Sequence, residues 1–294
     1  MAASPVNRKS GHHARSNSLP TRTHPLISEF NEQLSRLRDS EATSSSSTSI
    51  CQKLNGLQDL HDCVDKLLLS SQFTQALAHE QQEKWVNELL DGSLRLLEVC
   101  GIAKEALQQT KECTDEFQST LRRRRGSKTD LAREVERYLS SRMVVKKAMQ
   151  KALKGMQNKF NYKNNEYVGM VSMLKEVEAG TLMVFESLLT FIGGSKLQSK
   201  LSSWFLVSKL VHPKRACEGD EETYANEFEK VDVALRSLVI SQKTSKSDHT
   251  VPVENVQNCM GKLESSILDL QEMLECLSRH LVKTRVSLLN TFNH

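Results

Sequence analysis

Two segments of this 294-residue chain place apolar or small residues at alternating spacings of three and four, and each pattern runs for 36 residues. That spacing aligns the residues along one stripe of an α-helix, about 54 Å long at 1.5 Å per residue. The first stripe comprises Val86, Leu89, Ser93, Leu96, Cys100, Ala103, Leu107, Thr110, Thr114, Phe117 and Leu121, and the second comprises Val256, Met260, Leu263, Ile267, Leu270, Leu274, Leu277, Leu281, Thr284, Leu288 and Thr291. Stripes of equal length predict two helices that pack on each other in one bundle, and dimerisation through one of the stripes is the alternative.

Few helix-breaking residues occur elsewhere in the chain. Glycine is present 12 times and proline 5 times, and shorter apolar patterns with helical spacing lie between and before the two long stripes. We therefore predict an all-α fold, an elongated antiparallel helical bundle that forms a single domain over residues 26–294. A Ser-rich linker near 40–49 and loops near 212–222 and 241–251 interrupt the predicted bundle, and Ser49 is expected to cap the helix after the linker.

Sequence motifs for catalysis and for cofactor binding are missing. The nine histidines form no H-E-x-x-H motif, no serine lies in G-x-S-x-G, and there is no glycine-rich nucleotide loop. The seven cysteines include no C-x-x-C pair, which predicts reduced thiols rather than a disulfide framework or a zinc site. We expect a protein that is not an enzyme, with no cofactor, no metal and no evident small-molecule substrate.

Secretory and membrane-spanning signals are also missing. The longest apolar run, residues 181–192, is interrupted by Glu186 and is too short to span a bilayer, so it predicts a buried core helix. The N-terminus has no apolar segment of the kind found in secretory signals. These features predict an intracellular protein of the cytoplasm, the nucleus or both.

Residues 1–25 form a basic, Ser-rich arm without acidic residues, a composition that predicts disorder because little apolar surface is available to bury. Residues 15–20 fit the pattern R-S-x-S-x-P, which 14-3-3 proteins recognise when its second serine is phosphorylated. The residues of this candidate motif are Arg15, Ser16, Ser18, which is the candidate phosphosite, and Pro20. A chance match within the arm is one alternative, and chloroplast targeting by the arm is another.

Positive charge is concentrated between Arg122 and Lys159, where 13 basic residues stand against three acidic ones, while the whole chain carries a net charge of only +4. The candidate basic patch comprises Arg122, Arg123, Arg124, Arg125, Lys128, Arg133, Arg137, Lys146, Lys147, Lys151 and Lys154. The expected apolar face of the same helix comprises Leu131, Val135, Leu139, Val145, Met149, Leu153, Met156 and Phe160. Ser127 follows four arginines at the junction of two predicted helices and is a second candidate phosphosite.

This basic segment has several interpretations. Binding to an anionic membrane surface and nuclear association with nucleic acid both follow from its charge. Aromatic residues are sparse within it, which leaves no stacking platform for single-stranded nucleic acid. A solvated helix face, partly neutralised by the acidic region 218–229, is the simplest alternative.

Five short motifs lie at residues 13–20, 24–25, 91–101, 121–125 and 283–290. Together they resemble the pattern of a plant-specific family of unknown function called BPS-like or BYPASS-like, and the resemblance spans essentially the whole chain. It implies a role in root and shoot development, with no established catalysis and no assigned catalytic residues. We therefore expect an interaction or regulatory protein that acts through protein contacts and phosphorylation-controlled binding, self-association included. A peripheral membrane protein and a nuclear nucleic-acid-associated protein are the alternatives.

Overall fold

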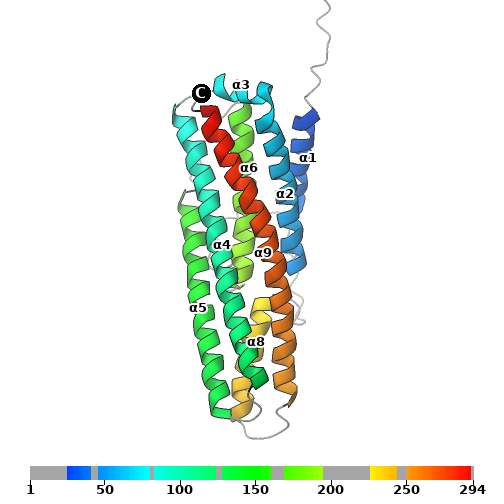
Figure 1. The fold of residues 1–294 in the computed structure, drawn as a ribbon, viewed down its shortest axis with the longest axis vertical. Helices are drawn as coiled ribbons and strands as arrows, with labels where there is room; N and C mark the ends of the chain where they lie inside the picture. Colours follow the sequence, from blue (N-terminus) through cyan, green and yellow to red (C-terminus); the bar gives the residue numbers. More distant parts are fainter. Residues whose placement is uncertain are drawn as a thin grey trace, which may run out of the picture.

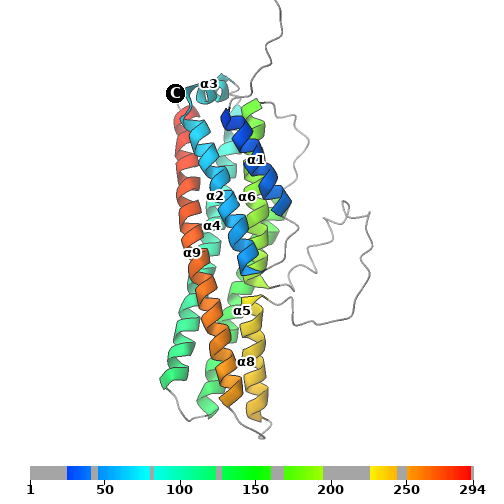
Figure 2. The ribbon, with the colours of Figure 1, turned by 90° about the vertical axis from the view of Figure 1, so that its right-hand side faces the viewer.

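The computed structural model describes residues 25–40, 46–79, 83–123, 128–159, 169–194, 226–243 and 250–292. The helices are α1 (Pro25–Asp39), α2 (Ser47–Leu69), α3 (Ser71–His79), α4 (Glu83–Arg123), α5 (Lys128–Lys159), α6 (Gly169–Gly193), α8 (Glu227–Lys243) and α9 (Thr250–Phe292). No strand occurs in these ranges, and all helices except α3 lie along one long axis (Figures 1 and 2). The predicted all-α, elongated antiparallel bundle is thus confirmed. The 14-3-3 motif of the arm lies outside the described residues.

The two long stripes face each other along α4 and α9, which lie side by side (Figure 1). The Cys100 thiol lies 3.8 Å from the carbonyl oxygen of Leu274, and the Gln118 amide donates to Glu264 at 3.2 Å. Partner numbers fall along α9 as they rise along α4, so the two helices are antiparallel. Apart from the end positions, the stripe residues are at most 9% exposed. Their burial within one chain favours the predicted bundle over dimerisation through these stripes.

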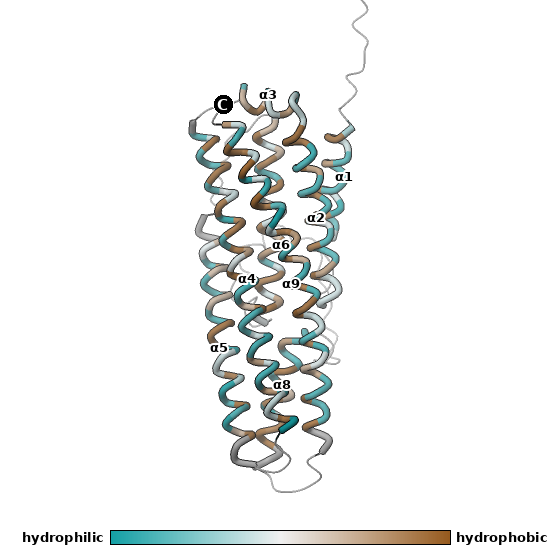
Figure 3. Tube along the Cα trace, in the orientation of Figure 1, coloured by the Kyte–Doolittle hydropathy of each residue, from teal (hydrophilic) through white to brown (hydrophobic). Residues whose placement is uncertain are grey.

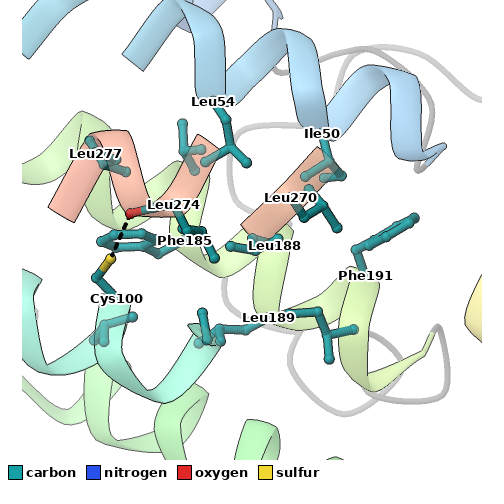
Figure 4. Packing of buried hydrophobic residues seen from close by; sticks show 14 of the residues in the cluster. Ile50, Leu54, Cys100, Phe185, Leu188, Leu189, Phe191, Leu270, Leu274 and Leu277 are labelled. Atoms are coloured by element: carbon teal, nitrogen blue, oxygen red, sulfur yellow. Dashed lines mark hydrogen bonds between the residues drawn. The ribbon is translucent and has the colours of Figure 1, made fainter. Parts of the chain in front are cut away.

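The core is centred on α6, which packs between the other long helices. Phe185 and Leu188 of α6 lie close to Leu54 of α2 and Leu274 of α9 (Figure 4). All four side chains are completely buried. In Figure 3, α6 is mostly hydrophobic, whereas α4 and α5 alternate between polar and apolar residues along their length. The predicted core segment 181–192 lies within α6, as expected for an apolar helix that buries most of its circumference.

Two local features differ from the predictions. The N-cap of α2 is Ser46, whose hydroxyl oxygen accepts a hydrogen bond from the backbone N–H of Ser49 at 3.2 Å. The prediction that Ser49 is the cap is therefore wrong, because Ser49 supplies the N–H group that the cap satisfies. The loop predicted near 241–251 is shorter, since α8 continues to Lys243 and α9 begins at Thr250. Residues 41–45 and 212–222 lie outside the described part of the chain.

Candidate functional site

One face of α5 presents a basic stripe to solvent. The inward face of α5 is marked by side chains that are at most 3% exposed, namely Val135, Tyr138 and Val145. Because this face is buried in the core, the opposite face of the helix must point to solvent. All residues of this α5 outer stripe are exposed, and their spacings alternate between four and three: Arg133, Arg137, Ser140, Val144, Lys147, Lys151 and Lys154. The stripe contains five cations and no acid, and it is about 32 Å long.

The cations of the α5 outer stripe differ in their surroundings. Arg137 lies 3.7 Å from a carboxylate oxygen of Glu116 on α4. The three lysines of the stripe have no carboxylate within ion-pair distance among the residues that the structure describes. Because they are exposed and unpaired there, these ammonium groups are accessible to an anionic surface outside the bundle.

Other members of the predicted patch cluster where α4 ends and α5 begins. Arg122 donates a hydrogen bond of 2.9 Å to the side chain of Gln118, and Arg123 is exposed beside it. The helix break predicted at Gly126 falls between these helices. Outside the described residues lie Arg124, Arg125, the candidate phosphosite Ser127 and the side chain of Lys128.

Lys146, predicted as part of the basic patch, is instead bound to an acidic residue of the same chain. Its Nζ lies 2.5 Å from Oδ2 of Asp232 on α8. The other oxygen of this carboxylate lies 3.6 Å from Nε of Arg142, which is 2% exposed. The Arg142 guanidinium also donates to the carbonyl oxygen of Ile192 at 3.0 Å and lies 4.8 Å from the centre of the Phe228 ring. The Asp232 carboxylate therefore joins α8 to α5, and the Arg142 guanidinium joins both to α6.

The sequence carried a signal for this buried arginine. The predicted apolar face of α5 passes from Leu139 to Val145, a gap of six residues where helical packing requires an intermediate position. Arg142 fills that gap in the structure, and Tyr138 is the buried residue one turn before it, where the predicted Leu139 is only partly buried. Asp232 is the acid that pairs with Arg142 and Lys146, whereas residues 218–225 of the predicted acidic region lie outside the described residues. Burial also raises the pKa of Tyr138 to about 12, so its hydroxyl stays protonated beside this cluster.

A complementary stripe lies on α4. The residues of this α4 outer stripe are all exposed, and their spacings again alternate between three and four. They are Asp91, Leu94, Glu98, Gly101, Glu105, Gln108, Glu112 and Asp115. Asp115 pairs with Lys111 at 3.3 Å, and Glu112 accepts a hydrogen bond from Gln108 at 2.7 Å. The other three acids have no cation within ion-pair distance among the described residues. The stripe contains five acids and no base.

A second group of titratable side chains lies inside the opposite half of the bundle. His61 of α2 is 1% exposed, and its Nε2 lies 3.0 Å from Oγ1 of Thr181 on α6. The Thr181 hydroxyl donates its own proton to the carbonyl oxygen of Val177 at 2.7 Å, so His61 must be the donor of the shared hydrogen bond. Burial lowers the pKa of His61 to about 4, which keeps the ring neutral.

Among the described residues, three side chains have the spacing of a metal site, namely Asp62, Asp65 and His280. His280 Nδ1 lies 3.0 Å from Oδ2 of Asp65, and the Lys283 ammonium lies 3.1 Å from the same oxygen. A divalent cation would have to displace both contacts, and the positive charge of the nearby Lys283 ammonium would repel it. This group therefore fits an ion-pair network between α2 and α9 better than a metal site.

A surface groove lies between α2 and α9 and has a volume of about 520 Å³. Its lining includes Cys51, Gln58, Asp269 and Cys276. Burial is the main cause that raises the pKa of Cys51, so this thiol stays protonated and is a poor nucleophile. The groove has no histidine in its lining that would act as a base toward either thiol.

The similarity of this chain to known proteins extends over most of the helical bundle and is not confined to one site. The sequence model of the family described as Protein BPS1 matches residues 53–291. The chain belongs to the BPS1 family. The match covers α4 and α5 completely and α9 except its last residue, so both outer stripes lie within the BPS1 region, and the resemblance to the BPS-like family is confirmed. No curated protein and no solved structure matches the chain. Among the described residues, no helix combines the length and apolarity required to cross a bilayer.

Proposed function

We propose that this member of the BPS1 family is a non-enzymatic interaction protein that acts in plant root and shoot development, with the α5 outer stripe as its binding surface. The observation that carries the proposal is the set of exposed lysines on α5, which no carboxylate among the described residues neutralises. Ion pairs across an interface direct and orient association more than they tighten it, so this surface suits regulated, reversible contacts.

Phosphorylation is the proposed control of these contacts. A phosphate on Ser18 would create the ligand for a 14-3-3 protein, and a phosphate on Ser127 would add about −1.5 to −2 charge next to the basic helix. The second modification would weaken attraction of the α5 outer stripe for an acidic partner, because Ser127 precedes Arg133, the first residue of the stripe, by only six positions in the sequence.

Proximity labelling in root tissue tests the proposed function. We expect the variant Lys147→Glu, Lys151→Glu, Lys154→Glu to lose the neighbours that the wild-type protein labels. The matched control reverses three exposed lysines on other helices, Lys84, Lys230 and Lys262, with the same change of net charge. An unchanged set of labelled proteins for the α5 variant would refute the stripe as a binding surface.

A peripheral membrane protein is the second candidate, favoured by Met143 and Val144, which are each 57% exposed beside the lysines of α5. Apolar side chains inserted among cations are typical of surfaces that bind anionic bilayers. Flotation with vesicles of phosphatidylserine and phosphatidylcholine tests this candidate. Binding that the α5 variant abolishes and the control variant retains would support it, and protein that stays at the bottom of the gradient would exclude it.

A further inference from the structure

We propose that the partner of the α5 outer stripe is the α4 outer stripe of a second copy of this chain, in a symmetric dimer with a two-fold axis along the bundle. The inference rests on the proposed function, since it names the partner of the same surface. Its basis is that one chain carries two neighbouring stripes of opposite charge, both exposed and both in heptad spacing. A surface with this property is complementary to itself, as a two-fold interface requires.

The two stripes match in charge number, length and spacing. Each carries five charges of one sign and none of the other. From Asp91 to Asp115 the α4 outer stripe is about 36 Å long, and from Arg133 to Lys154 the α5 outer stripe is about 32 Å long. Side chains spaced by three and four along both helices are the arrangement that lets two helices pack side by side at a small angle.

Contacts within the chain set the register of the proposed dimer. The Cys113 thiol lies 3.0 Å from the Ser141 hydroxyl, and the rings of Phe117 and Tyr138 are 5.9 Å apart, so these levels of α4 and α5 coincide. Equal steps along the antiparallel helices then put Glu105 of α4 at a level between the first two lysines of the α5 outer stripe. By the same count, Glu98 falls near the level of the third lysine, Lys154, and Glu112 near Ser140 and Val144.

Symmetry then decides which stripes meet. A two-fold axis parallel to the bundle keeps every residue at its own level and places α4 of one copy opposite α5 of the other. Glu105 of one copy would face Lys147 and Lys151 of the second copy, and Glu98 would face Lys154. A two-fold axis perpendicular to the bundle within the interface would instead place α4 on α4 and bring like charges together, which costs free energy.

The size of the surface suits a reversible dimer. Two adjacent helices, each about 10 Å wide and about 35 Å long, offer roughly 700 Å² per copy, near the roughly 800 Å² of a standard interface, and the charged stripes overlap over about 22 Å of that length. Large apolar side chains within the two stripes are few, namely Leu94 at 52% exposure and Val144 at 57%. Association should therefore depend mainly on charge and weaken with salt.

Sedimentation equilibrium of the full chain tests the inference. At about 50 mM NaCl we expect a mass twice the 33.2 kDa of one chain, and at about 500 mM a dissociation constant higher by at least about tenfold. The acidic-stripe variant Glu98→Lys, Glu105→Lys and the basic-stripe variant Lys147→Glu, Lys151→Glu, Lys154→Glu should each be monomeric. Circular dichroism should show full helicity for both, since all five residues are exposed.

Mixing the two variants gives the decisive result. Each variant alone brings like charges together, but a one-to-one mixture restores both opposite-charge contacts, so we expect a heterodimer at low salt. The control Lys84→Glu, Lys230→Glu, Lys262→Glu should dimerise like the wild-type protein. A monomeric wild-type protein at low salt, or a dimer that both variants retain, would overturn the inference. If the wild-type protein is monomeric while the basic-stripe variant loses labelled neighbours or vesicle binding, the proposed function stands and only the dimer fails.

Discussion

The basic residues of α5 fall into two groups that composition alone does not separate. Arg142 and Lys146 point toward α8 and share the carboxylate of Asp232, whereas Lys147 and Lys151 lie on the opposite side of the same helix. A step of one residue around the helix, from Lys146 to Lys147, changes the role of a lysine from structural to accessible. The contrast shows that the net charge of a segment does not reveal which cations are available for binding. That depends on the helix face on which each cation lies.

Loss of the shared carboxylate should have the largest effect on the interior group. Asp232→Ala leaves Arg142 buried with no charged partner, so we expect the free energy of unfolding to fall by about 3–5 kcal/mol. Urea denaturation monitored by circular dichroism measures the change.

Two further variants sharpen that experiment. Lys154→Ala removes an exposed cation of the same helix and should change stability by less than about 0.5 kcal/mol. The double variant Arg142→Met, Asp232→Leu removes both buried charges and should recover much of the loss. A loss below about 1 kcal/mol for Asp232→Ala would mean that the buried arginine does not depend on its carboxylate.

His61 extends the comparison to an interior group that is kept neutral. Its pKa in the folded protein is about 4, below the ordinary value of 6.5. Between these pH values the unfolded chain binds a proton that the folded protein excludes. The contribution of His61 to stability is therefore complete above pH 6.5 and falls by up to about 3 kcal/mol as the pH drops toward 4.

Chemical denaturation at pH 7.5 and at pH 4.5 measures this dependence on acid. The variant His61→Gln retains a donor for the Thr181 hydroxyl but does not titrate, so it should lose less stability between the two pH values than the wild-type protein. Because Asp65 and His280 act electrostatically on His61, the difference between variant and wild type is the informative quantity. Equal losses in both proteins would show that another group causes the acid sensitivity.

Two glycines of α4 repeat the contrast between interior and exterior with a smaller effect. A Cβ atom at Gly92 would lie 2.5 Å from Oε2 of Glu178, whose buried carboxylate pairs with Lys175 at 3.0 Å. Gly101 is exposed, and a Cβ atom there meets nothing within 4 Å. We expect Gly92→Ala to destabilise the protein by about 1–3 kcal/mol and Gly101→Ala to stabilise it by about 0.5–1 kcal/mol. Thermal unfolding of the two variants checks the opposite signs, and a shift in the same direction for both would contradict the close contact of α4 with α6.

The sequence predicted the features that depend on helical spacing. The stripes of α4 and α9 and the buried segment of α6 follow from apolar periodicity, which the core must satisfy along its whole length. The partner of Arg142 was not predictable in this way, because Asp232 lies 90 positions later in the chain and only the packing of α8 on α5 brings them together. The nine-residue helix α3 was also missed, since Ser71–His79 offers only Phe73 and Leu77 as buried residues. The two outer stripes are readable from the sequence only after the inward faces are known.

The antiparallel contact of α4 with α9 joins segments that the ribosome makes far apart in time. α9 supplies completely buried residues such as Leu270, Leu274 and Leu277 to a core that α2 and α4 also line. Until α9 emerges, the parts of α2 and α4 that it covers have no partner, although both helices already contact α6. Nascent chains of this protein should therefore expose apolar surface through most of their synthesis, and they depend on chaperones longer than a chain whose neighbouring helices pair in order.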